Sequence, residues 1–296
     1  MPQWSVILAA GAGRRLATVT GGVPKQFWRN HGGASLLDQT MSRFAPMVPL
    51  SRTVVIVDAT QRHYVADSGI ADSRVRIVVQ PEDRGTAAGV LLALTPVLES
   101  DPDAIVVMTP SDHGVVDGEA FRLGVMIAAH QARTRDDIVL FGVAPTAARD
   151  DYGWITVGRI PAVKALPVIL SFVEKPAPDV ATGLLAAGAV WNTMVLVARV
   201  GALRDLYARI LPDLTKFFAT ALRFPDAERS HFLATGYPAL PKLDFSRDLL
   251  ARASALSAYV WPESIGWSDL GTPERLREWS RGQRASTLNL EQFTAA

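Results

Sequence analysis

Cysteine is absent from the 296 residues of the sequence. Its absence excludes disulfide bonds, thiolate nucleophiles and cysteine-bound metals, so the fold does not depend on an oxidising compartment. A strong net charge is also missing, because 30 basic residues face 29 acidic ones. This balance gives no support to a role in binding nucleic acid or a membrane surface.

No apolar run approaches the ~18 residues that a membrane-spanning helix needs. The first predicted strand begins so close to Met1 that we expect no signal peptide and a cytoplasmic protein.

Lysine is scarce as well. The sequence has five lysines, at positions 25, 164, 175, 216 and 242. Two of them stand next to a proline, as Pro24-Lys25 and Lys175-Pro176. Since arginine supplies most of the other positive charge, these two lysines are candidates for specific roles.

Hydrophobic residues make up 49% of the chain, which is enough to bury a sizeable core. In the first half, short apolar runs typical of strands alternate with stretches typical of helices. The predicted strands are Ser5–Ala10, Thr53–Val57, Val75–Val79, Ala104–Met108 and Ile138–Val143. The predicted helices are Ser35–Met47, Gly85–Leu98 and Gly118–Arg133. This alternation predicts an α/β fold with a mostly parallel, Rossmann-like central sheet and helices on both faces.

The alternation of strands and helices ends at about Tyr152, and after it turns that contain proline and glycine separate the predicted strands. The predicted strands here are Trp154–Val157, Ile169–Glu174, Val190–Val197 and, later, Ala258–Trp261. The predicted helices are Val200–Phe224 with an interruption near Pro212, Asp244–Ala253, and Pro273 to about Arg281. We expect a mixed β wall facing the first half, within one domain over residues 1–296. Its parts are about 1–145, about 146–271, and a C-terminal helix and tail over 272–296.

The first predicted strand runs directly into a glycine turn with Gly11 and Gly13, followed by Arg14 and Arg15. Glycine lets the backbone approach a ligand closely, and its amides can point at an anion. With the nearby cations, including Lys25, the stretch predicts a phosphate cradle. It is not a dinucleotide fingerprint, which needs a third glycine where a leucine stands here, and the P-loop pattern is absent.

Two other features fit a phosphate ligand. The stretch from Gln80 to Ala88 joins a strand to a helix, and a helix N-terminus suits anions or polar base edges. The alternative is that Thr86 only caps the helix and binds no ligand.

Asp112 follows a predicted strand, and Asp269 stands far along the chain. Because Mg²⁺ commonly binds one or two carboxylates together with substrate phosphates, this pair is adequate for a metal. We read the adjacent His113 as structural.

These motifs, from about Val6 to about Leu276, resemble in order the signature LAxGxGxRL…PK of sugar-phosphate nucleotidylyltransferases. The form Pro24-Lys-Gln-Phe27 is most similar to mannose-1-phosphate guanylyltransferases. The resemblance implies a GT-A-like nucleotidyltransferase fold whose second half binds the sugar phosphate. It implies transfer of a nucleotidyl group from NTP to a sugar-1-phosphate with release of pyrophosphate, most simply GTP and mannose-1-phosphate giving GDP-mannose. It further implies small-molecule substrates only, and it is compatible with a homodimer.

The resemblance also implies site residues. The catalytic residues it implies are Arg15, Lys25 and Asp112. The residues it places at the nucleotide are Leu8, Ala9, Ala10, Gly11, Gly13, Arg15, Lys25, Arg84, Gly85, Thr86 and Ser111. The residues it places at the sugar phosphate are Tyr152, Gly153, Glu174, Lys175 and Asn192. The ligands it implies for Mg²⁺ are Asp112 and Asp269. Two positions depart from the family pattern, since Gly85 replaces an asparagine and no glycine follows Asn192-Thr193.

Three alternatives stay open. One is a uridylyl- or adenylyltransferase that acts on another hexose-1-phosphate. A second is a glycosyltransferase on a similar sheet, although the sequence lacks a DxD motif near Asp112 and this reading leaves Arg15 and Lys25 unexplained. A third is a non-catalytic regulatory protein that binds a nucleotide sugar, against which the presence of these cations and of both aspartates argues.

Overall fold

The computed structural model describes residues 1–29, 33–68, 70, 74–160 and 165–280. In this part of the chain, a nine-stranded sheet has the order β3-β2-β1-β4-β8-β5-β9, and β6 pairs with β7 and β8. The strands are β1 (Gln3–Leu8), β2 (Thr53–Asp58), β3 (Arg76–Gln80), β4 (Ile105–Pro110), β5 (Ile138–Val143), β6 (Gly153–Val157), β7 (Ile169–Glu174), β8 (Val190–Arg199) and β9 (Leu256–Val260). Each overlaps a strand predicted from the sequence.

The central sheet is mostly parallel, as predicted. β1 pairs in parallel with β2 and β4, β2 with β3, and β5 with β9. β8 lies antiparallel between β4 and β5, and the antiparallel β6–β7 pair continues from it. Because β8 and β9 come late in the chain yet lie in the central sheet, the sheet is continuous across residue 145.

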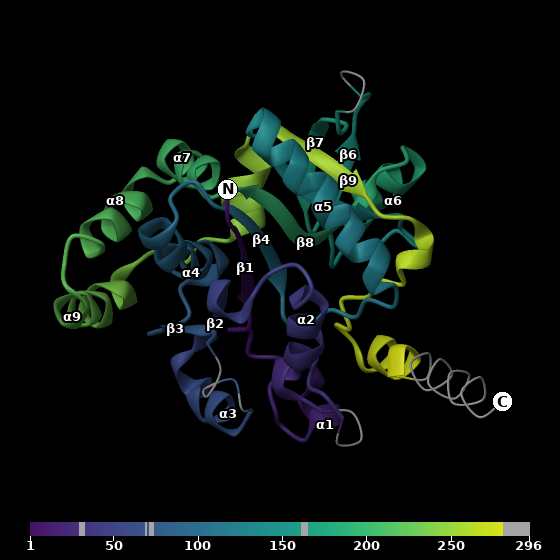
Figure 1. The fold of residues 1–296 in the computed structure, drawn as a ribbon. Coiled ribbons are helices and arrows are strands. Elements are labelled where there is room, and N and C mark those ends of the chain that lie inside the picture. Colours follow the sequence, from purple (N-terminus) through teal and green to yellow (C-terminus); the bar gives the residue numbers. More distant parts are fainter. Residues whose placement is uncertain (30–32, 69, 71–73, 161–164, 281–296) are drawn as a thin grey trace.

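Helices cover both faces of the sheet (Figure 1). They are α1 (Ala17–Thr20), α2 (Leu36–Phe44), α3 (Arg62–Asp67), α4 (Gly85–Ser100), α5 (Gly118–Arg135), α6 (Pro178–Ala186), α7 (Val200–Ile210), α8 (Pro212–Ala221) and α9 (Asp226–Gly236). Alternation along β2 sends Val54 and Ile56 into the cluster with α4 and α7, and Val55 and Val57 into the cluster with α2. Such two-sided burial explains the continuous apolar runs of the parallel strands. None of the described helices is long and apolar enough to cross a bilayer.

The segment predicted as a helix over Asp244–Ala253 is helical and is capped by the Asp244 side chain, which accepts from the Arg247 amide, but it is not an α-helix. The segment forms a π-helical turn at Phe245–Leu249, followed by a 3₁₀ turn at Leu250–Arg252. Contacts with distant segments shape it: the Phe245 amide donates to the Thr86 hydroxyl at 2.7 Å, and the Ser246 hydroxyl contacts the Met194 sulfur at 3.0 Å. These contacts override the local helical pattern. The helices α1, α3, α6 and α9 were not predicted. The final helix is present over 273–280, and Arg281 lies outside the described residues.

The start of α4 packs directly against the backbone around Leu243. The Ala87 amide donates to the Leu243 carbonyl at 3.0 Å, which satisfies one of the free N–H groups of the helix. Gly85 has a φ of 79°, and a Cβ atom added there would lie 2.9 Å from the Leu243 backbone nitrogen and closer still to its carbonyl oxygen. Glycine is therefore required at this position by both its backbone angle and the close approach of another segment.

We predict that Gly85→Ala lowers the free energy of unfolding by about 2–5 kcal/mol, because left-handed φ and overpacking both add a cost. Gly188 provides a matched control, since its φ is 75° but an added Cβ would meet no atom within 4 Å. Gly188→Ala should lose only about 1–2 kcal/mol. Chemical denaturation of both variants measures the difference, and equal losses would contradict the close approach at Gly85.

Candidate functional site

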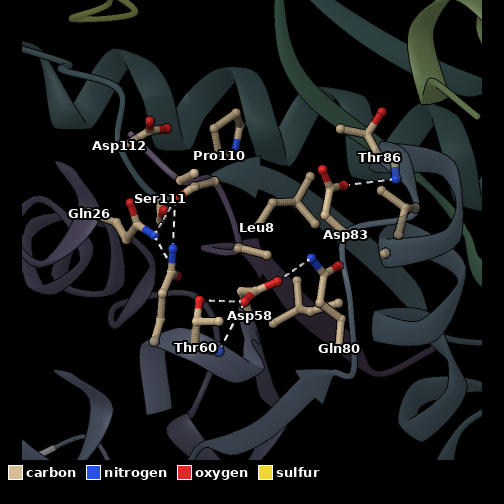
Figure 2. Close-up of a pocket in the computed structure, with 18 of the residues that line it drawn as sticks. Leu8, Gln26, Asp58, Thr60, Gln80, Asp83, Thr86, Pro110, Ser111 and Asp112 are labelled. Carbon is tan, nitrogen blue, oxygen red and sulfur yellow. Dashed lines mark hydrogen bonds between the residues drawn. The ribbon is translucent and has the colours of Figure 1, made fainter. Parts of the chain in front are cut away.

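A cavity of about 530 Å³ opens at the carboxyl ends of the parallel strands β1, β2, β3 and β4 (Figure 2). Its lining includes Leu8, Ala10, Gly11, Arg14, Asp58, Gln80, Gly85, Thr86, Ser111 and Asp112. This is the edge at which ligands bind in open α/β sheets. The fold therefore brings the glycine turn, the start of α4 and the end of β4 to one cavity.

Two glutamines fix the glycine turn. The Gln26 amide donates to the carbonyls of Ala9 and Gly11 at 2.7 and 3.0 Å, and to Gln61 Oε1 at 2.9 Å. The Gln61 amide donates to the Gly11 carbonyl at 2.9 Å. This role of the two glutamines was not predicted, because the contacts join segments far apart in the chain. Ala9 itself is buried in the core and does not line the cavity.

The turn also carries two arginines, which the structure places differently. Arg14 lines the cavity, whereas Arg15 is exposed and is not among its lining residues. Gly13, with a φ of 62°, lies beside the Lys25 backbone, since an added Cβ would be 2.9 Å from the Lys25 nitrogen. The catalytic role of Arg15 stays a prediction.

Lys25 contacts both Asp112 and Asp269, which stand far apart in the sequence. Its side chain is buried, with the residue only 5% exposed, and Nζ lies 3.2 Å from Asp112 Oδ2. The same ammonium donates to the backbone carbonyl of Asp269. Burial opposes ionisation of Asp112, but the nearby charge of Lys25 holds the pKa of this carboxyl below its usual value. Burial lowers the pKa of His113 to about 4, so its imidazole is neutral near pH 7.

The Asp269 carboxylate is held by partners that the sequence did not reveal. Arg275 donates to both of its oxygens, at 2.7 and 2.9 Å, and the Tyr152 hydroxyl donates at 2.7 Å. Arg275 also donates to Asp151 at 3.0 Å and lies 4.9 Å from the Tyr152 ring centre. Burial and the Asp269 charge raise the pKa of Tyr152 well above its ordinary value, so the phenol stays a donor. The position of Arg275, six residues after Asp269, carried no signal in the sequence.

A second group of predicted residues gathers on β6, β7 and β8. Gly153 pairs with Glu174 across the strands, and a Cβ at Gly153 would lie 2.6 Å from Glu174 Oε2 and 3.4 Å from Asn192 Cβ. Burial raises the pKa of Glu174, whose Oε1 lies 3.5 Å from Lys175 Nζ. The Tyr152 backbone carbonyl accepts from the Lys175 amide at 3.1 Å, but the Tyr152 side chain lies beside Asp269 as described above.

The Arg84–Thr86 stretch is only partly turned to the cavity. Gly85 and Thr86 line it, whereas Arg84 does not and pairs with Glu82 at 3.0 Å. The Thr86 hydroxyl accepts from the Phe245 amide and donates to Asp244 Oδ2 at 3.2 Å. Its hydroxyl is therefore engaged in holding the π-helical turn against α4.

Backbone strain concentrates at these groups. Three non-glycine residues with left-handed φ lie here: Lys175 at 48°, Met194 at 60° and Leu270 at 49°. Each such conformation costs about 1–2 kcal/mol, and strained residues cluster at functional sites. Met194 sits where the β5–β8 register shifts, and it lines the cavity. No local pattern in the sequence predicts these angles.

The residues only partly fit a metal ion. Asp112 offers an ionised, partly exposed carboxylate, whose Oδ2 contacts Lys25. The Asp269 carboxylate accepts from Arg275, Tyr152 and the Gly271 amide, so a cation bound there would compete with Arg275. Among the described residues, no group of three or more His, Cys, Asp or Glu side chains forms a metal cage. The donor chemistry suits an oxygen-preferring ion that takes further ligands from its substrate.

Comparisons with known proteins give a matching family and several relatives. A family model described as nucleotidyl transferase matches residues 4–285. The chain is 30% identical over 277 residues to the xanthan biosynthesis protein XanB of Xanthomonas campestris pv. campestris (strain B100), covering 90% of this chain and 57% of that one. It is 28% identical over 286 residues to the mannose-1-phosphate guanylyltransferase of Escherichia coli (strain K12), covering 94% and 59%. The chain thus spans less than two thirds of these relatives.

A solved structure is also similar. The protein described as mannose-1-phosphate geranyltransferase from Thermus thermophilus superposes with a TM-score of 0.81 at 28% identity. The match covers 92% of this chain and 77% of that one.

We predict that Arg275→Gln lowers the free energy of unfolding by about 2–3 kcal/mol, since it leaves the carboxylates of Asp269 and Asp151 without their shared cation. Arg277 is a matched control on the same helix, because its side chain is 56% exposed and its ion pair within the described residues is with exposed Glu274 at 3.5 Å. Arg277→Gln should stay within about 0.5 kcal/mol of the wild type. Urea denaturation compares the two, and a neutral Arg275→Gln variant would show that the ion pairs add nothing to stability.

Proposed function

The chain belongs to the nucleotidyl transferase family, and on that premise we propose that it transfers a nucleotidyl group from NTP to a sugar-1-phosphate. The observation that carries this proposal is the buried Lys25 ammonium between Asp112 and Asp269, next to a cavity large enough for a nucleotide. The finer proposal is GTP and mannose-1-phosphate giving GDP-mannose. The name of the Escherichia coli relative and the Pro24–Phe27 motif support it.

The reaction needs positioning and charge neutralisation rather than a general base. A sugar-phosphate oxygen is already anionic, so it can attack the α-phosphorus directly. The bond from the α-phosphorus to the oxygen that bridges it to the β-phosphate breaks, and pyrophosphate leaves with that electron pair. Catalysis then rests on in-line placement and on cations around the phosphates. We expect Lys25 to bind phosphate near the reacting centre and Arg15 to bind the leaving pyrophosphate.

The sugar phosphate would lie against β6, β7 and β8. Asn192 is buried and Glu174 is half-buried, and both could hydrogen-bond sugar hydroxyls. Gly153 is packed against the Glu174 side chain, and we expect the backbone there to approach the sugar ring. Lys175 is 63% exposed in its side chain and projects from the end of β7, where it can reach a phosphate. In this proposal, the cavity at the ends of β1 to β4 binds the NTP, and the neighbouring surface of β6, β7 and β8 binds the sugar phosphate.

We expect Mg²⁺, or another divalent ion that prefers oxygen, to be held by Asp112 and the NTP phosphates. Asp269 would join them only after it exchanges Arg275 for the metal. Such an ion neutralises phosphate charge and orients the triphosphate. The chain's own contribution is to keep Asp112 ionised through Lys25.

The proposal is tested by measuring pyrophosphate release with GTP, UTP, ATP, CTP and dTTP, each with mannose-1-phosphate or glucose-1-phosphate. We predict the highest kcat/KM for GTP with mannose-1-phosphate. Lys25→Gln should lower kcat by roughly 10²-fold or more, as expected for a lost transition-state contact. Lys216→Gln, on the exposed side of α8, should leave it unchanged. Equal or better turnover of UTP or ATP would refute the choice of GTP, and preference for glucose-1-phosphate would refute mannose.

The metal proposal predicts that Asp112→Asn and Asp269→Asn each lose most activity at saturating Mg²⁺, because each removes a charge with little change in size. The double variant should lose less than the two losses combined, since the pair acts as a unit. Asp103→Asn is the control, because Asp103 is exposed and pairs with Arg199 away from the site. Full activity of either single variant in excess EDTA, or strictly additive losses at limiting Mg²⁺, would contradict a shared metal site.

A further inference from the structure

Helix α5 carries apolar residues on two sides. Its inner side packs on the sheet through buried residues that include Phe121 and Val125 (Figure 1). Its outer side carries Leu123, Met126 and Ile127, which are 52%, 53% and 39% exposed. A surface helix normally turns charged and polar residues outward. The inner side already accounts for how α5 is held on the sheet, so the outer apolar residues call for another explanation.

The outer residues follow the spacing of a helix–helix contact. Steps of four, three, four and three residues lead along one side of α5 from its first turn to its last turn. The positions on this line are Glu119, Leu123, Met126, His130 and Arg133, and all of them are exposed. Alternating steps of three and four residues are typical of the contact line of two paired helices. We call these five residues, together with Ile127, the outer stripe.

The outer stripe has opposite charges at its two ends. Glu119 lies in the first turn of α5 and Arg133 in the last turn, seven residues on either side of Met126. Neither side chain has an ion-pair partner in the described part of the chain. An apolar centre with one acidic and one basic end is complementary to a copy of itself that runs in the opposite direction.

We infer that the outer stripe binds the outer stripe of a second copy of this chain, with the two α5 helices antiparallel about a two-fold axis near Met126. Such an axis brings the same surface of both copies together. Leu123, Met126 and Ile127 then cover their counterparts, which removes apolar surface from water. The inference goes beyond the proposed function and does not depend on it.

The charges select the direction of pairing. In the antiparallel arrangement, Glu119 of each copy lies beside the turn that carries His130 and Arg133 of the other copy. A parallel arrangement would instead place Glu119 beside Glu119 and Arg133 beside Arg133, and like charges in contact disfavour it. A helix of 18 residues is about 27 Å long, so we expect a small interface and a Kd on the order of 10 µM.

The experiment is sedimentation equilibrium of the full chain from about 1 to 500 µM, a range that brackets this Kd. The wild type should pass from monomer to dimer. Leu123→Glu should weaken the dimer by roughly 100-fold or more, because the change occurs in both copies at the centre of the contact. Met126→Lys is a second variant with the same expected effect. Val180→Glu is the matched control, since Val180 is 45% exposed on α6 and should leave the Kd unchanged.

Reversal of the end charges tests the antiparallel direction. Glu119→Arg and Arg133→Glu should each weaken the dimer, because each brings like charges together. The double variant should recover most of the wild-type affinity, since its end charges are again complementary. Each change also opposes the dipole of α5, so lost helix stability would make the double variant the worst of the three. Circular dichroism confirms that each variant is folded.

Three results would overturn the inference. The first is a wild type that stays monomeric over the whole range. The second is a dimer that persists in folded Leu123→Glu and Met126→Lys variants, which would place the contact on another face. The third is a double charge reversal that dimerises no better than the single ones, which would exclude the antiparallel pairing. Pyrophosphate release by any of these proteins tests the proposed function separately.

Discussion

The site depends on the buried ammonium of Lys25, which contacts the Asp112 carboxylate and the Asp269 backbone carbonyl. A buried charge is unfavourable unless it is paired and hydrogen-bonded, and its partners here come from segments far apart in the chain. Lys25 follows the glycine turn, Asp112 follows β4, and Asp269 stands near the C-terminal helix. The cluster therefore holds the glycine turn, the sheet edge and the late part of the chain in one arrangement.

The charges of this cluster are balanced within the protein. Lys25 pairs with Asp112, Arg275 pairs with Asp269 and Asp151, and Arg149 pairs with Asp151. A phosphate ligand must therefore compete with a carboxylate for Lys25, and a metal ion must compete with Arg275 for Asp269. Ligand binding at this site is an exchange of ionic partners, whose free energy is the difference between two sets of contacts.

The continuous sheet explains how two binding regions come to be neighbours. β8 runs antiparallel between β4 and β5, so it carries Asn192 into the middle of a sheet whose parallel strands hold the cavity. The register shift opposite β5 gives Met194 a left-handed backbone at the cavity wall. The other two strained angles are at Lys175, directly after β7, and at Leu270, directly after Asp269. The surrounding packing holds these conformations, which would be unfavourable in an isolated peptide.

Local sequence determined the strands, the mostly parallel sheet and the glycine turn, because apolar periodicity and glycine act over a few residues. It also marked Lys25, Asp112 and Asp269 as candidates. Only the tertiary structure decided which groups meet: Arg275 with Asp269, Gln61 with the glycine turn, and Asp58 with Gln80. It also replaced the predicted helix at Asp244–Ala253 by a π-helical turn. These pairings depend on strand register and on packing between distant segments, which set side-chain distances that no short stretch of sequence contains.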